Sequence, residues 1–251
     1  MKNKKGERKD WPTRTARAII SHFSFFISSL RQTVFPSTCA SCGRVLAAGE
    51  EQLCLHCLSA LTSTHYSDLP DNPAERQLAA IPNLVAATAM LHYRKETVVQ
   101  KVVHSMKFHG NSELCIMMGR MLALDMMRGG RFDGIDLLVP VPLHWLRRIS
   151  RGYNQSLLIC RGMAEVLHRP IVDGCLVRHR YTRKQSRQRT RTRGSNVAGA
   201  FCVRRPTLFE GKHILLVDDV LTTGATLLSC ADALATVPDL KISVATLSIA
   251  G

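Results

Sequence analysis

Hydrophobic runs and amphipathic segments alternate along the last two thirds of the chain. Short runs rich in Val, Leu and Ile predict buried strands, and apolar residues at a 3.6-residue period predict helices. The expected strands span 84–94, 137–142, 213–220 and 241–251, and the expected helices span 97–108, 113–127, 154–170 and 223–237. This alternation is typical of an α/β fold with a parallel sheet and helices on both of its faces. Ligands of such folds bind beyond the carboxyl ends of the strands.

These patterns divide the chain into four segments. Residues 1–34 form a basic, amphipathic N-terminal extension, and residues 35–62 form a small cysteine-rich module. Residues 63–82 are polar and rich in proline and turn-forming residues, which predicts a linker. The α/β domain is expected at 83–251. With 251 residues and 45% hydrophobic content, the chain is long enough to bury a substantial core.

The N-terminal extension superficially resembles a secretory signal, because an apolar stretch follows a lysine-rich start. Its apolar part, 19–30, carries a histidine and four serines and is far shorter than the roughly 20 residues that span a membrane. We therefore expect no transmembrane segment. Phe23, Phe26, Ile27 and Leu30 recur at helical spacing. They predict an amphipathic helix that packs on the domain behind it or contacts a membrane surface.

The charge balance favours anionic partners. The chain has 34 Lys and Arg residues against 19 Asp and Glu residues, a net charge of +15. Such basicity is typical of proteins that bind nucleic acid, phosphate ligands or acidic membranes. Generic basicity is the alternative, and composition alone does not decide between them. The nine cysteines form no even disulfide framework and four of them are paired, so we expect a reducing, cytoplasmic setting.

The paired cysteines occur in the stretch CASCGRVLAAGEEQLCLHC. Cys39 and Cys42 form one CxxC pair, Cys54 and Cys57 form the other, and eleven residues separate the pairs. Two turns of this kind can direct four thiolates at one tetrahedral zinc ion. His56 lies inside the second pair and offers an alternative ligand, although four cysteines are the simpler set. A closed four-sulfur site leaves no open position for water, which indicates a structural role.

The most informative stretch is HILLVDDVLTTGATLLSC, residues 213–230. The strand brings Asp218 and Asp219 to the carboxyl edge of the sheet, and the following Thr-rich turn leads into a helix. The free N–H groups at that helix start, the threonine hydroxyls and the flexible Gly224 suit a phosphate. Two acids beside a phosphate suit a ligand that also carries hydroxyl groups or a magnesium ion. A sugar phosphate satisfies both conditions, whereas the P-loop motif is absent.

These motifs carry a family resemblance. VDDVLTTGAT resembles the phosphoribosyl-pyrophosphate signature of type I phosphoribosyltransferases. LVPVPLHWLRRISRGYNQSLL, residues 138–158, and QSRQRTRTRGSNVAGAF, residues 185–201, resemble two further blocks of the ComF/GntX family. Members of that family join a four-cysteine zinc ribbon to a phosphoribosyltransferase domain. The resemblance implies a zinc ribbon at 35–62 and an α/β, parallel-sheet, type I phosphoribosyltransferase-like fold at 83–251.

The resemblance also implies how phosphoribosyl pyrophosphate binds, with magnesium arriving on the ligand. Asp218 and Asp219 contact the ribose hydroxyls and are the first two expected catalytic residues. The residues expected to hold the 5-phosphate are Thr222, Thr223, Gly224, Ala225 and Thr226. The residues expected to meet the pyrophosphate are Arg147, Arg148 and Arg151.

Residues 178–193 contain eight Arg or Lys residues and no acid. In the transferase interpretation this segment closes over the pyrophosphate, with Arg183, Lys184 or Arg187 stabilising the leaving charge, and Arg183 and Lys184 complete the catalytic set. Stabilising the pyrophosphate needs only one or two cations. The additional Arg and Lys residues of this segment therefore indicate that it binds a longer polyanion, such as single-stranded DNA or RNA. The residues expected to contact nucleic acid are Arg187, Arg189, Arg191 and Arg193. A merely solvated basic segment is the alternative.

Two functional classes follow from the sequence. The first is an enzyme that transfers a phosphoribosyl group to an unidentified acceptor, in a protein linked by its resemblance to DNA uptake (competence) or DNA utilisation. The second is a non-catalytic, single-stranded nucleic-acid-binding module whose phosphoribosyl site is regulatory. Both acids of the signature are intact, which is consistent with activity. In either class, association with a DNA-uptake machinery is an expected partnership.

Overall fold

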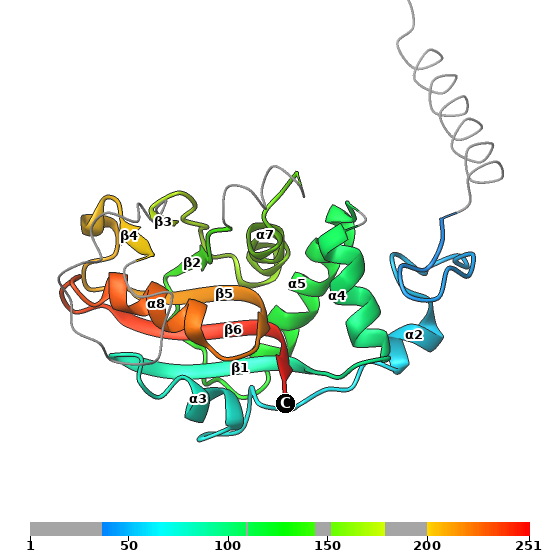
Figure 1. Cartoon of the computed structure of the whole chain (residues 1–251), viewed down its shortest axis with the longest axis horizontal. Helices are drawn as coiled ribbons and strands as arrows, with labels where there is room; N and C mark the ends of the chain where they lie inside the picture. The colour runs from blue at the N-terminus through cyan, green and yellow to red at the C-terminus, as the bar shows by residue number, and fades with distance from the viewer. Residues whose placement is uncertain (1–36, 109, 144–151, 179–199) are drawn as a thin grey trace, which may run out of the picture.

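Four parallel strands form the central sheet (Figure 1). Their order is β1 (Leu84–Tyr93), β6 (Lys241–Ala250), β5 (His213–Leu221) and β2 (Leu137–Pro140). Neighbouring strands pair in parallel throughout. The computed structural model describes residues 37–108, 110–143, 152–178 and 200–251, so the expected N-terminal extension at 1–34 lies outside it.

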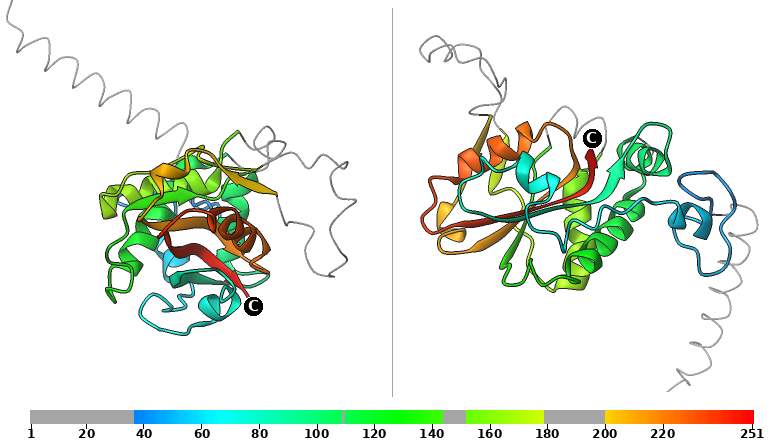
Figure 2. Two further views of the ribbon diagram at one scale, coloured as in Figure 1. Left: turned by 90° about the vertical axis from the view of Figure 1, so that its left-hand side faces the viewer. Right: turned by 90° about the horizontal axis from the view of Figure 1, so that it is seen from below.

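Helices cover both faces of this sheet, as Figure 2 shows from two sides. The helices on one face are α4 (Val98–Phe108), α5 (Ser112–Met126) and α7 (Gln155–Leu167), and those on the other are α3 (Pro73–Gln77) and α8 (Ala225–Leu234). Strand side chains alternate between the two cores, with Leu215 and Val217 in the first and Ile214 and Leu216 in the second. The period of two along a strand explains this division. The prediction of a parallel sheet with helices on both faces is therefore confirmed.

All eight elements expected from the sequence are present, with ends that differ by three residues or fewer. The helix expected to reach 170 ends at Leu167, because His168 adopts a left-handed conformation with φ of 52°. The sequence did not predict β3 (Leu176–Arg178) or β4 (Phe201–Val203), which pair antiparallel beside the main sheet. Strands of three residues are too short to display an alternating pattern.

Three further short elements lie outside the expected set. They are α2 (Leu55–Ser59) in the cysteine-rich module, α3 in the segment 63–82, and a 3-10 turn at Pro206–Leu208. No helix within the described ranges is both long enough and apolar enough to cross a membrane.

The segment 63–82, expected to be a linker from its composition, packs against β1. Its centre is Asn72, whose side-chain oxygen accepts hydrogen bonds from the amides of Ala74 and Glu75 and so caps α3. The Asn72 amide nitrogen donates to the Ala87 carbonyl of β1 at 2.9 Å. Leu78, immediately after α3, is fully buried in the core on this face. The turn-forming residues of this segment therefore hold a short helix on the sheet.

Helices α5 and α7 pack at unusually close range through two glycines. A Cβ atom at Gly119 would collide with the carbonyl oxygen of Ile159, and one at Gly162 would collide with the carbonyl oxygen of Ile116. Real Cβ atoms do not approach backbone oxygens this closely, so any larger residue would force the helices apart. The glycine pair thus sets the position of α7 against α5.

This packing predicts that Gly119→Ala destabilises the protein by about 1–3 kcal/mol in urea unfolding. The direction of this change in the free energy of unfolding is diagnostic, because a Gly→Ala substitution in an uncrowded helix stabilises a protein by up to about 1 kcal/mol. Leu124→Ala, at an exposed position of the same helix, is the control and should change the free energy of unfolding by less than about 0.5 kcal/mol. A Gly119→Ala variant as stable as the parent protein would contradict the close approach.

Candidate functional site

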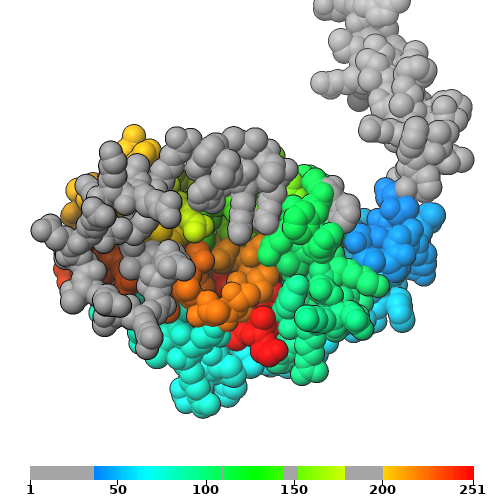
Figure 3. All heavy atoms as spheres, in the orientation of Figure 1, coloured from blue at the N-terminus to red at the C-terminus, as the bar shows by residue number. Residues whose placement is uncertain are grey.

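The acid pair lies at the carboxyl end of β5 and lines a cavity of about 240 Å³. Asp218 and Asp219 lie within the pairing of β5, which continues to Leu221 beside β6. The cavity is lined from several elements by Lys107, Val141, Pro142, Leu143, Gln155, Ser156, Arg178, Asp218, Asp219, Val220, Thr222 and Thr226. In Figure 3 the orange surface of the β5–α8 region lies next to the green surface of α4 and α5. The expected position at the carboxyl edge of the sheet is therefore the observed one.

The two carboxyl groups have different partners. The Ser156 hydroxyl donates a hydrogen bond of 3.0 Å to Oδ1 of Asp218, which also accepts one from the amide of Asp219 at 2.9 Å. Asp219 instead forms an ion pair with Lys107, whose Nζ lies 3.0 Å from Oδ2. Burial, followed by the charge of Asp219, raises the pKa of Asp218 to about 7. Near neutral pH, in the absence of ligand, Asp218 is therefore partly protonated.

The turn after β5 forms a small hollow at the start of α8. The hollow measures about 30 Å³ and is lined by Asp218 and by the residues from Val220 to Leu227. Gly224 caps the helix with φ of 74°, and a Cβ atom there would lie 3.1 Å from Cδ2 of Leu78. Both the backbone conformation and this contact favour glycine. The first amides of α8 have no partner within the helix, which suits an anion.

Two residues of the segment 63–82 contact the turn that forms the hollow. The Gln77 side-chain amide donates a hydrogen bond to the carbonyl of Thr222, and Leu78 packs beneath Gly224. The Thr223 hydroxyl accepts a bond from the amide of Ala225 at 3.5 Å. The contacts of Gln77 and Leu78 therefore hold the turn from outside the strand–helix unit, and the Thr223 bond holds it from within.

Among the polar residues that line the cavity, sequence reasoning did not name Lys107, Gln155, Ser156 or Arg178 as site residues. Lys107 is the last basic residue of α4, and its helical spacing gave no sign that α4 ends at the acid pair. Ser156 lies at the start of α7, inside the block quoted for the family resemblance. Arg178 begins the basic segment and lies on β3, with its guanidinium carbon 5.4 Å from the centre of the Phe201 ring.

The remaining predicted residues lie outside the described part of the chain. The expected pyrophosphate contacts Arg147, Arg148 and Arg151 fall in 144–151. The segment 179–199 contains the other expected residues, Arg183, Lys184, Arg187, Arg189, Arg191 and Arg193. These assignments therefore stay predictions.

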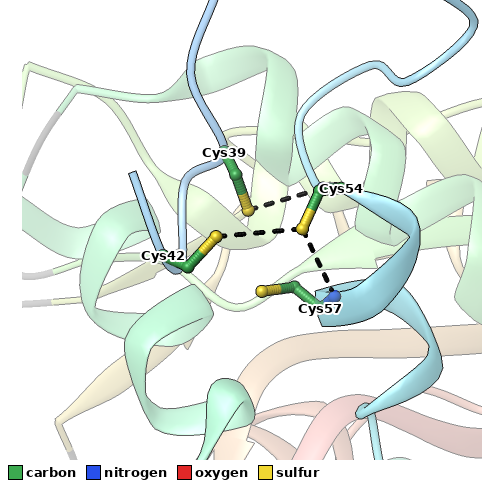
Figure 4. A group of neighbouring side chains, drawn as sticks. All are labelled: Cys39, Cys42, Cys54 and Cys57. Atoms are coloured by element: carbon green, nitrogen blue, oxygen red, sulfur yellow. Dashed lines mark hydrogen bonds between the residues drawn. The ribbon is translucent and has the colours of Figure 1, made fainter. Parts of the chain in front are cut away.

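The four paired cysteines converge as the sequence predicts (Figure 4). Their sulfur atoms all lie within 4.8 Å of one another, and three of the four residues are buried. Among the described residues this group contains no histidine, so His56 is not part of it. The prediction of a four-cysteine cluster is confirmed.

The chemistry of the cluster fits a zinc ion. The amide of Cys54 donates to Sγ of Cys39 and the amide of Cys57 donates to Sγ of Cys54, each at 3.4 Å. Burial opposes ionisation of Cys39, but amide donors from Cys54, Cys42 and Ser41 outweigh it and lower its pKa to about 6. Thiolates that accept amide hydrogen bonds are the ligands that structural zinc prefers.

The raised pKa of Asp218 predicts a pH-dependent stability difference. Between about pH 4 and pH 7 the folded protein holds the Asp218 proton more tightly than the unfolded chain, so stability falls as pH rises through this window. Asp218→Asn removes the ionisable group and should raise the free energy of unfolding by about 1–2 kcal/mol near pH 8. The gain should shrink toward pH 5, measured by urea unfolding. Asp232→Asn, at an exposed position of α8, is the control and should not show this change with pH. If Asp218→Asn changed the free energy of unfolding by the same amount at pH 5 and pH 8, the raised pKa of Asp218 would be contradicted.

Comparison with known proteins agrees with this geometry. The family model described as "Phosphoribosyl transferase domain" matches residues 154–248, a range that includes α7, β5, the acid pair and α8. A structure of the allosteric regulatory enzyme of purine biosynthesis overlaps 53% of this chain and 25% of its own, with 21% identity and a TM-score of 0.38.

Two relatives carry the comparison further. The DNA utilization protein YhgH of Escherichia coli O157:H7 is 30% identical over 199 residues, which cover 78% of this chain and 83% of the relative. Competence protein F of Haemophilus influenzae is 33% identical over 93 residues, or 37% of this chain and 41% of the relative. With the phosphoribosyltransferase domain, the parallel sheet and the four-cysteine cluster, this similarity places the chain in the ComF/GntX family.

Proposed function

We propose that this protein binds phosphoribosyl pyrophosphate with Mg²⁺ at the acid pair and the start of α8. One observation carries the proposal: the hollow at the start of α8 and the cavity of the acid pair share Asp218, Val220, Thr222 and Thr226. A single ligand with a phosphate at one end and hydroxyl groups beside it would fill both. Phosphoribosyl pyrophosphate has this arrangement, and the phosphoribosyltransferase domain match supports it.

In this proposal the turn from Thr222 to Thr226 holds the 5-phosphate through backbone amides and hydroxyls. The ribose hydroxyls donate to Asp218 and Asp219. Mg²⁺ supplies charge neutralisation at the pyrophosphate when it arrives with the ligand.

If the site transfers the phosphoribosyl group, an acceptor nitrogen forms a bond to the sugar C1 as the C1–oxygen bond breaks. Pyrophosphate then leaves with the bonding electron pair. The protein contributes position and charge stabilisation, the latter expected from Arg183 and Lys184.

The biological setting of the proposal comes from the relatives. Their names, DNA utilization protein and competence protein, support a role for this protein in the use or uptake of DNA. The residues proposed to contact single-stranded DNA are Arg187, Arg189, Arg191 and Arg193, where the sequence is densely basic. The nine cysteines, four of them paired at metal-ligand spacing, support the proposal of a reducing, cytoplasmic setting.

We propose zinc as the structural metal of the cysteine cluster. Cys39, Cys42, Cys54 and Cys57 would hold it, and the small module around them would depend on it for folding.

The ligand proposal predicts saturable binding of phosphoribosyl pyrophosphate with Mg²⁺ in isothermal titration calorimetry. The double variant Asp218→Asn, Asp219→Asn should bind at least about tenfold more weakly, because neutral amides replace two hydroxyl-binding carboxylates. Asp232→Asn, exposed on α8, is the matched control and should bind as the parent protein does.

The opposite result would separate the two functional classes. If the parent protein does not bind this ligand but binds single-stranded DNA in fluorescence anisotropy, the phosphoribosyl proposal fails. The nucleic-acid-binding interpretation would then replace it. If the double variant loses both ligands, one site serves both.

The zinc proposal predicts about one zinc ion per chain in protein purified without added metal, measured by atomic emission. Cys54→Ser should lower both the zinc content and the solubility, because the ligand set and the fold of the module fail together. Cys202→Ser, at a partly buried cysteine outside the cluster, is the control and should retain the metal. A metal-free parent protein that stays folded would rule the assignment out.

A further inference from the structure

Among the described residues, Lys107 is the basic side chain that forms an ion pair with the acid pair, through Asp219. It lies near the end of α4, and its Nζ is 3.0 Å from Oδ2 of Asp219. The Lys107 side chain is 22% exposed and that of Asp219 is 15% exposed, so the pair is largely shielded from water. Lys107 also lines the same cavity as both carboxyl groups. Its ammonium group is therefore part of the site that receives the ligand.

This contact changes the charge that an incoming phosphate meets. Two ionised carboxylates next to a phosphate would repel it strongly in a shielded cavity. Lys107 offsets the charge of Asp219, and Asp218 is held in a hydrogen bond from Ser156. The positive end of α8 supplies the remaining attraction at the hollow. Without any metal ion, Lys107 thus offsets one of the two carboxylate charges that a monophosphate ligand would meet.

We propose that Lys107 is a built-in counter-cation that lets this site bind a ribose 5-phosphate group without a metal ion. The inference rests on the proposed function, because it assumes that the hollow at α8 holds the 5-phosphate. Mg²⁺ is then required only for the additional charge of a pyrophosphate at C1. A free sugar phosphate and the 5′-phosphate end of a nucleotide both carry the group in question.

Other cations fit this role less well. Arg178 also lines the cavity, but its guanidinium carbon lies 5.4 Å from the centre of the Phe201 ring, and no ion pair between it and either carboxyl group is seen among the described residues. Lys101 lies on the same helix as Lys107, is exposed, and lines a neighbouring groove rather than the cavity of the acid pair. Lys101 therefore serves as a matched control, since its neutralisation removes the same charge from the same helix.

The test is isothermal titration of the zinc-loaded full chain with ribose 5-phosphate, in buffer freed of Mg²⁺ by a chelating resin and again with excess Mg²⁺. The parent protein should bind in both buffers, with affinities that differ by less than about threefold. Lys107→Gln should weaken metal-free binding by about tenfold or more, and Mg²⁺ should restore most of the loss. Lys107→Arg should keep metal-free binding, and Lys101→Gln should behave as the parent protein. This dependence on metal is a readout that loss of a merely structural ion pair would not produce.

Three outcomes would overturn the inference. The first is a Lys107→Gln variant that binds ribose 5-phosphate without metal as well as the parent does. The second is a parent protein that binds it only with Mg²⁺. The third is metal-free binding of AMP but not of ribose 5-phosphate, because the base would then carry the affinity.

Titration with phosphoribosyl pyrophosphate and Mg²⁺ shows whether the site of each variant is intact. If the parent binds that ligand and one of the three outcomes occurs, only the role of Lys107 is lost. If the parent binds neither ligand, the proposed function and this inference are both wrong.

Discussion

Two adjacent carboxyl groups at the end of β5 share one small cavity, and their mutual repulsion must be balanced by the groups around them. The groups that offset this repulsion come from two helices that lie far apart in the sequence. Lys107 of α4 pairs with Asp219, and Ser156 at the start of α7 donates to Asp218. Buried charges of like sign persist in proteins only where such partners exist, and their persistence commonly marks a functional site.

The position of those partners depends on packing elsewhere in the molecule. Gly119 allows α5 to approach α7 closely, which sets the position of α7 against α5. Asn154 then caps α7 and donates to the Val141 carbonyl after β2, so Ser156 is fixed relative to the sheet. On the opposite face, Gln77 and Leu78 of the segment 63–82 support the turn after β5. The site is therefore a property of the whole domain and not of the signature motif alone.

Much of this arrangement was accessible from the sequence. The period of the hydrophobic residues predicts the buried strands and the helices, and the spacing of the four cysteines predicts their cluster. Both signals are local in the sequence. The order of Asp218, Asp219 and Gly224 predicted that the acids and the turn before α8 lie at one edge of a parallel sheet. Lys107 was not predicted, because its contact with Asp219 is a tertiary one that no local pattern encodes. The packing of the segment 63–82 on the sheet was not predicted either, because its proline and turn residues do not show which residues bury Leu78.

The central claim is that the acid pair and the start of α8 form one ligand site. The most direct measurement is a two-dimensional ¹H–¹⁵N spectrum of the zinc-loaded protein during titration with phosphoribosyl pyrophosphate and Mg²⁺. The account predicts concerted shifts of the amide signals of Asp219, Thr223, Gly224 and Ala225 that saturate at a single ligand concentration. Saturating shifts elsewhere in the protein, with these four amides unchanged, would contradict it.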